Sequence, residues 1–318
     1  MFKKILFVAL VVSCLPGCSM KSLMVKTFEV ALPDIRLAFY GEKSPRQAML
    51  AGPALLKILD SLIISAPQNE TLLFEGVQMY GSYGLSFADD HPEWAARIHE
   101  RGFEYGVRLL ELSSGNWSDA FNRGLPALEK RLATATLNDL PALFWTAANW
   151  AGKINVSKRD ITAVADLPLP SAIMQWVYKK DPTYFHASPA MFLARYHSSR
   201  PAHLGGDPEK AKAYFEEALR IGKGRFLLTK VYYARDYATM NQDLALFDRL
   251  LQEVIEADDN IMPEFLLGTA VAKEMARNLQ KEKNRWFNIS QESEGTHSGT
   301  PGDSLPDFDG GDLPDLDD

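Results

Sequence analysis

The stretch Asp207-Pro208-Glu209-Lys210-Ala211-Lys212-Ala213-Tyr214-Phe215-Glu216-Glu217-Ala218-Leu219 carries the most regular pattern of the 318-residue chain. Its apolar side chains recur three or four residues apart, which is the period of one face of an α-helix. Asp207 is a typical N-cap, and Pro208 suits the first helical position, where a backbone N–H has no helical partner. Small alanines at 211 and 218 let a second helix come close, and the aromatic pair fills the groove between the two helices. The stretch therefore predicts a helical hairpin.

Helix signals of this kind recur along the chain, whereas strand signals are nearly absent. Ser44-Pro45, Asp181-Pro182 and Ser188-Pro189 each place a capping side chain before a proline, and Ser44 forms a capping box with Gln47. Two segments, 139–152 and 263–275, are apolar or small on nearly every side and should be central. The fold class is therefore all-α. We predict helices near residues 45–65, 70–88, 92–112, 124–134, 139–152, 170–179, 189–199, 208–221, 226–235, 241–257 and 263–283.

The helix at 208–221 resembles the second helix of a tetratricopeptide repeat. A degenerate copy of its pattern begins at Pro92 and uses Glu93, Ala95, Ile98 and Gly102 at the same offsets. The two copies are 116 residues apart, which is no multiple of the repeat's period of about 34 residues. We therefore expect irregular tetratricopeptide-like helical hairpins, stacked as an α-α superhelix with a concave surface.

The N-terminus has the three parts of an export signal. Lys3 and Lys4 supply positive charge, residues 5–12 form an apolar run too short to span a bilayer, and Leu15-Pro16-Gly17-Cys18 ends it with small residues and a thiol. This arrangement resembles a bacterial lipoprotein signal, although proline is unusual at position 16. We expect a signal peptide over 1–17 and lipidation of Cys18. Cys18 is followed by Ser19 and not by aspartate, as in lipoproteins that are sent to the outer membrane.

Only two cysteines occur, Cys14 and Cys18, so a chain cut before Cys18 keeps one acylated cysteine and forms no internal disulfide. The net charge of −7 is concentrated in the tail, where nine acidic and no basic residues follow Arg285. The remaining body is nearly neutral and has no basic stripe of the kind that binds nucleic acid. We expect a helical domain over 18–287 and a disordered acidic tail over 288–318.

Several segments occur in a specific order, namely LPALFWTAANWA at 140–151, VADLP at 164–168, YHSSRP at 196–201, GGDPEKA at 205–211, YFEEAL at 214–219 and NQD at 241–243, with Phe247, Leu250 and Leu251. Taken together, they resemble the T-component (TatT) lipoproteins of tripartite ATP-independent periplasmic (TRAP) transporters. The resemblance covers most of residues 70–286 and implies a tetratricopeptide-type helical protein that forms trimers. It further implies a channel through each protomer and association with the periplasmic solute-binding subunit of the transporter. The acidic C-terminal extension departs from the family pattern.

Candidate channel residues lie on the predicted helix at 139–152. Trp145 and Asn149 are four residues apart on one face, and Trp150 lies beside them. For a single tryptophan, core packing with a satisfied indole N–H is the commoner explanation, but an apolar channel needs large aromatic walls and a few fixed polar groups. Arg200 and His203 are candidates for contact with a ligand or partner, or else they cap the carbonyl end of the helix before them.

No catalytic constellation is recognisable, because the histidines lack metal-ligand spacing and neither a nucleophile elbow nor a phosphate loop occurs. We therefore expect no enzyme, no cofactor and no metal. The leading hypothesis is a lipid-anchored accessory protein on the periplasmic face of a bacterial membrane, which binds a TRAP solute-binding protein and passes or holds an apolar small molecule. The alternative is a structural adaptor that organises an envelope protein complex without a ligand.

Overall fold

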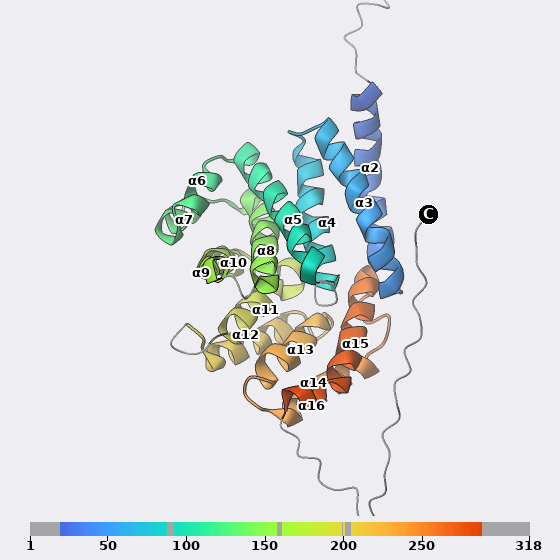
Figure 1. The fold of residues 1–318 in the computed structure, drawn as a ribbon, viewed down its shortest axis with the longest axis vertical. Helices are drawn as coiled ribbons and strands as arrows, with labels where there is room; N and C mark the ends of the chain where they lie inside the picture. Colours follow the sequence, from blue (N-terminus) through green and yellow to red (C-terminus); the bar gives the residue numbers. More distant parts are fainter. Residues whose placement is uncertain (1–19, 88–91, 158–160, 199, 201–204, 288–318) are drawn as a thin grey trace, which may run out of the picture. The chain divides into compact units, whose positions relative to one another are not determined.

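The computed structural model describes residues 20–87, 92–157, 161–198, 200 and 205–287. Every regular element in these residues is a helix, which confirms the all-α prediction (Figure 1). The helical unit ends at Phe287. The elements are α2 (Met20–Tyr40), α3 (Pro45–Ser65), α4 (Glu70–Phe87), α5 (Pro92–Ser113), α6 (Trp117–Asn122), α7 (Leu125–Leu132), η1 (Leu137–Asp139), α8 (Leu140–Val156), α9 (Ile161–Ala165), α10 (Pro168–Lys180), α11 (Tyr184–Ser198), α12 (Pro208–Ile221), α13 (Leu228–Tyr232), η3 (Tyr233–Ala238), α14 (Leu244–Glu256), η4 (Pro263–Phe265), α15 (Leu266–Lys281) and α16 (Lys283–Trp286).

The helix α8 is central, as its apolar sequence predicted. It packs against α4, α5 and α10, and nearly all of its residues from Leu140 to Trp150 are buried. Glycines allow α5 to come this close: a Cβ on Gly102 would lie 2.2 Å from Asn149 Oδ1, and one on Gly106 would lie 2.2 Å from Thr146 Oγ1. Any larger residue at these two positions would push α5 away from α8.

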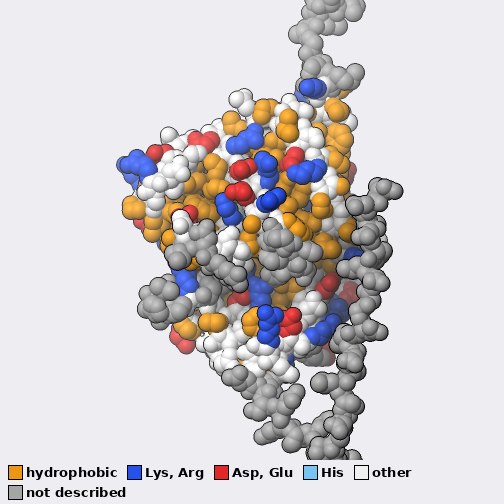
Figure 2. All heavy atoms as spheres, in the orientation of Figure 1, with side chains coloured by type: hydrophobic (Ala, Val, Ile, Leu, Met, Phe, Trp, Pro, Cys, Tyr) orange, Lys and Arg blue, Asp and Glu red, His pale blue; other side chains and the backbone are white. Residues whose placement is uncertain are grey.

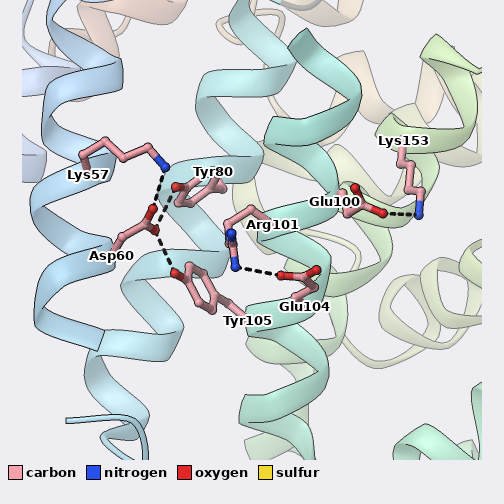
Figure 3. Close-up of polar contacts among 8 residues, drawn as sticks. All are labelled: Lys57, Asp60, Tyr80, Glu100, Arg101, Glu104, Tyr105 and Lys153. Atoms are coloured by element: carbon pink, nitrogen blue, oxygen red, sulfur yellow. Dashed lines mark hydrogen bonds and ion pairs between the residues drawn. The ribbon is translucent and has the colours of Figure 1, made fainter. Parts of the chain in front are cut away.

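Polar contacts fix α3, α4 and α5 against one another (Figure 3). The Asp60 carboxylate of α3 accepts hydrogen bonds from the hydroxyls of Tyr80 on α4, at 2.8 Å, and Tyr105 on α5, at 2.7 Å. Burial alone would raise the pKa of Asp60, but the hydrogen bonds from Lys57, Tyr105 and Tyr80 outweigh it and hold the pKa below its ordinary value. The carboxylate therefore stays charged and joins the three helices at neutral pH.

Among the described helices, α3 has the length and apolar composition that a membrane span would need. Core helices meet the same criteria, and α3 buries Leu56, Leu59, Leu62 and Ile63 while it packs against α4. Its N-terminus has the predicted cap, because Ser44 Oγ accepts the backbone N–H of Gln47 at 3.3 Å.

In the C-terminal part, α11 packs against α12 as the opening stretch of sequence predicted. Asp207 caps α12 by accepting the backbone N–H of Lys210 at 3.0 Å, and Pro208 is the first helical residue. Ala211, Phe215 and Ala218 are buried. The ring of Phe215 stacks on Tyr233 at 4.6 Å, so the aromatic side chain does fill a groove between helices.

Several predicted boundaries were wrong. Asp181 does not start a helix: it ends α10, and its carboxylate accepts the backbone N–H of Thr183 instead. The helix predicted at 189–199 agrees with the regular part of α11, which follows Ala187, but a left-handed turn at Phe185, His186 and Ala187 precedes it and was not predicted. The helix predicted at 226–235 is the short α13, followed by the π-helix η3. The whole of α2 was missed because Pro33, which argues against a helix interior, lies inside it at an exposed position.

We predict that Ala211→Leu lowers the free energy of unfolding by about 1 to 3 kcal/mol, because the added methylenes would be forced into the buried contact between α12 and its neighbours. Ala213→Leu on the same helix is the matched control, because Ala213 is exposed. Urea denaturation of both variants measures the difference. Equal stability of the two variants would contradict the packing described for α12.

Candidate functional site

The three candidates on α8 are all buried, but they do not share one environment. Trp145 and Asn149 face α4, where a Cβ on Gly81 would lie 2.9 Å from Asn149 Nδ2 and 3.1 Å from the Trp145 ring. The Trp150 ring instead packs against Phe103 at 5.0 Å and Phe121 at 5.3 Å. The structure therefore brings Trp145 and Asn149 together, as their spacing predicted, and places Trp150 in a separate aromatic group.

Asn149 has partners for both ends of its amide. Its Nδ2 donates to the carbonyl oxygens of Val77 on α4 and Trp145 on α8, each at 2.9 Å. Its Oδ1 lies 3.4 Å from Nδ1 of His99 on α5. The residue thus joins α4, α5 and α8, and its hydrogen bonds satisfy a polar group that would be costly to bury alone.

His99 is the buried titratable group closest to the candidate residues. Its ring lies in a slot between two glycines, because a Cβ on Gly84 or on Gly152 would approach it to 2.4 Å. Burial lowers the pKa of His99 to about 4, against a smaller opposing effect of the Asn149 hydrogen bond. The imidazole is therefore neutral in the folded chain at pH 7.

Trp145 also belongs to a second set of contacts, which we call the aromatic cluster. Its ring meets Phe185 edge-to-face at 4.7 Å and Phe144 at 5.1 Å, and Tyr184 meets Phe144 at 4.9 Å. The cluster joins segments that are distant in sequence, namely α2, α8, the start of α11, Phe226 in the loop before α13, and η4. Its members are Tyr40, Phe144, Trp145, Tyr184, Phe185, His186, Phe226 and Phe265.

A turn of three consecutive residues with left-handed backbone conformation lies at the centre of this cluster. Phe185, His186 and Ala187 have φ of 39°, 61° and 63°. Each such non-glycine residue costs about 1 to 3 kcal/mol, so the surrounding packing must hold the turn in place. His186 contributes to this, since its ring lies 5.3 Å from Phe226 and 6.2 Å from Phe265. Strained backbone of this kind concentrates at ligand-binding and switch segments.

The rings of the strained turn are only partly covered: Tyr184, Phe185 and His186 are half-buried, whereas Trp145 behind them is buried. Burial lowers the pKa of His186, so its ring is neutral and adds no charge to the surface. The cluster thus offers an apolar surface whose outer layer is accessible and whose inner layer is fixed. Sequence analysis missed this turn, although the aromatic run Tyr184-Phe185-His186 lies between Pro182 and Pro189.

Two cavities lie in the described residues, and neither is lined by Trp145, Asn149 or Trp150. An apolar crevice between α2, α3 and α4, beside Arg36, Tyr40 and Tyr83, has a volume of about 10 Å³, roughly that of one water-sized probe. An open polar depression of about 480 Å³ lies beside Ser114, Arg131 and Asp139. Its polar side chains bond to one another: Ser114 Oγ donates to Asp139 at 2.8 Å, and Arg131 donates to Ser114 Oγ at 3.0 Å.

Of the two remaining candidates, Arg200 is half-buried and its guanidinium lies 3.5 Å from the centroid of the Tyr196 ring. It follows the last residue of α11 and so lies at the opposite end of that helix from the aromatic cluster. His203 is outside the described residues. The Arg200 contact is a cation–π interaction that holds the end of α11.

Sequence analysis did not find the partly buried ion pairs of Asp236. The Asp236 carboxylate in the π-helix η3 accepts from Arg195 Nε at 2.7 Å and from Arg235 Nε at 2.8 Å. Burial would raise the pKa of Asp236, but the two guanidinium groups outweigh it and hold the pKa far below its ordinary value. No sequence spacing links Arg195 to Asp236, since only the fold brings α11 and η3 together.

Within the part of the chain that the structure describes, no group of three or more His, Cys, Asp or Glu side chains is placed to hold a metal ion.

The neutral state of His99 leads to a pH prediction. The unfolded chain, with a histidine pKa of about 6.5, takes up a proton before the folded chain does, so this stabilisation is complete above about pH 6.5 and is lost as the pH falls toward about 4. We expect the free energy of unfolding to decrease by roughly 1 kcal/mol per pH unit in that window from this residue. Urea denaturation of the wild type and His99→Gln isolates the effect, with His297→Gln in the tail as control. An unchanged pH dependence in His99→Gln would refute it.

Comparison with known proteins places this geometry in a family. Residues 41–287, which run from before α3 to the end of the helical unit, match the family model described as TRAP transporter T-component. A protein of Treponema pallidum (strain Nichols), described as uncharacterized, is 21% identical over an alignment of 312 residues that covers 86% of this chain and 95% of that protein. The resemblance stated from the sequence segments is confirmed, and the chain belongs to the TRAP transporter T-component family.

Proposed function

We propose that this chain is a lipid-anchored accessory protein of a TRAP transporter, which binds the periplasmic solute-binding subunit and passes or holds an apolar small molecule. Family membership supports an accessory role in such a transporter and an envelope location, and the family is not one of enzymes. The single observation that supports the apolar ligand is the strained, half-buried aromatic turn at Phe185 and His186, in contact with Trp145.

We infer that the ligand path runs along the outer layer of the aromatic cluster. Trp145 then acts as the fixed wall behind Phe185, and Asn149 holds α8 in register with α4 and α5. Trp150 lies in its own aromatic group, and Arg200 with His203 would contact the partner and not the ligand. The filled interior around Asn149 favours the alternative, a structural adaptor that organises an envelope complex without a ligand.

The tetratricopeptide-like superhelix is part of the proposal. Helices that follow each other in the chain pack together, namely α4 with α5, α11 with α12, and α14 with α15. A homotrimer would cover apolar side chains that protrude from α2 and α3, among them Val30, Leu37, Leu50 and Ile64. Monomers rarely leave so much apolar surface in contact with water. The acidic tail at 288–318 is proposed to remain outside the helical unit.

The anchor is tested by labelling the protein with palmitate in a bacterium that acylates lipoproteins. We expect Cys18→Ser to abolish incorporation, because Cys18 is the proposed attachment site and the signal peptide at 1–17 contains the other cysteine. Cys14→Ser is the matched control and should label like the wild type. Label retained in Cys18→Ser would place the modification elsewhere, and no label in the wild type would remove the anchor from the proposal.

The ligand path is tested with Phe185→Ala, which removes a half-buried ring and leaves Trp145 in place. We expect weaker binding of Nile red, an apolar fluorescent probe, by roughly tenfold, since truncating a half-buried aromatic contact costs about 1 to 2 kcal/mol. Pull-down of the solute-binding subunit should be unchanged. Trp176→Ala is the matched control, because Trp176 is a half-buried ring of α10 outside the cluster.

If Phe185→Ala binds Nile red as the wild type does, the adaptor alternative is favoured. Trp145 is less suitable for this test. Loss of a buried tryptophan costs about 3 to 5 kcal/mol of stability, which would impair every activity at once.

A further inference from the structure

The first turns of α2 expose a concentration of apolar side chains. Leu23 is 60% exposed, Met24 51% and Phe28 36%, whereas Val25 between them is buried. Successive helical residues are rotated by about 100°, so Leu23, Met24, Thr27 and Phe28 share one outward arc. In Figure 2 hydrophobic side chains follow the edge of the molecule over α2. This arc has no partner among the described residues that would bury it.

Basic side chains border the arc. Lys21 and Lys26 are both exposed, and the rotation per residue places one on each side of the apolar arc. No acidic residue occurs in α2 before Glu29. An apolar arc between two lysines is the pattern of a helix that lies in the boundary between lipid headgroups and acyl chains, with the ammonium groups at the phosphates.

The position of the arc in the chain identifies what covers it. Met20, the first residue of α2, follows Cys18 by two positions, so it lies at most about 7 Å of extended chain from the cysteine. A lipid attached to Cys18, as proposed above, would hold the first turns of α2 at the headgroups of the same membrane. A second copy of the chain is a poorer occupant, because it would bring two pairs of lysines together.

We propose that residues 21–28 of α2 form a membrane-contact element that takes a phospholipid surface with anionic headgroups. Leu23, Met24 and Phe28 enter the headgroup boundary, and Lys21 and Lys26 bind lipid phosphates. The inference rests on the proposed anchor and adds to it: the anchor tethers the chain, and this element sets the direction in which α2 leaves the membrane. Val25 is buried and the rest of α2 packs against α3, so the orientation of α2 at the membrane also orients the helical unit.

The test uses the acylated full chain in vesicles of phosphatidylethanolamine and phosphatidylglycerol. Cleavage before Cys18 removes Cys14 and acylation blocks the thiol of Cys18, so a cysteine introduced by Met24→Cys is the single site for an environment-sensitive fluorophore. A nitroxide on the lipid headgroup should quench this probe by about half, as expected for a group at the interface. Leu37→Cys is the matched control, because Leu37 is 64% exposed on the same helix and about 20 Å further along it. Its probe should not be quenched.

Loss of both ammonium groups provides the second arm. Lys21→Ala with Lys26→Ala should reduce the quenching at position 24, and vesicles of phosphatidylcholine alone should reduce it in the wild type as well. Palmitate labelling of the same samples reports the anchor separately. When Cys18 is labelled, absent quenching at position 24, or equal quenching at positions 24 and 37, would overturn the inference and leave the anchor intact. A blue-shifted but unquenched probe would place the arc against protein and would overturn it too.

Discussion

The close approach of α4 and α5 to α8 is the constraint on which the rest of the structure depends. Gly102 and Gly106 bring α5 against Asn149 and Thr146, while Gly84 and Gly152 leave the slot that His99 occupies. At this distance the Asn149 amide bonds α4 and α8 together and lies beside the His99 ring. The contact fixes the rotation of α8 about its axis, and that rotation decides which way every ring on the helix points.

With α8 fixed in this way, Trp145 presents one edge to α4 and another to Phe185. The buried Trp145 ring therefore supports the strained turn at Phe185, His186 and Ala187 on its inner side. On the outer side of the turn, Phe185 and His186 are only partly covered. A rigid inner layer and an accessible outer layer are what an apolar site requires if its shape is to exist before the ligand arrives. The ion pairs of Asp236 with Arg195 and Arg235 hold the far part of α11 in the same manner.

Local sequence signals predicted much of the fold and little of the site. The caps at Ser44 and Asp207 and the alanines of α12 were readable because their partners lie within one helical turn or one hairpin. The left-handed turn at 185–187 was not, because contacts with Phe226 and Phe265, far along the chain, stabilise it against its intrinsic preference. The same holds for Trp150: its spacing from Trp145 was visible, but the separate aromatic group with Phe103 and Phe121 was not.

We propose that a fixed α8 core supports an adaptable aromatic surface at the start of α11, where an apolar ligand binds. Hydrogen–deuterium exchange of the full chain, measured with and without an apolar ligand and the TRAP solute-binding subunit, tests it most directly. We expect slow and unchanged exchange in α4, α5 and α8, and slower exchange at 184–187 when the ligand is added. Unchanged exchange at 184–187, or protection confined to helices outside the aromatic cluster, would contradict it.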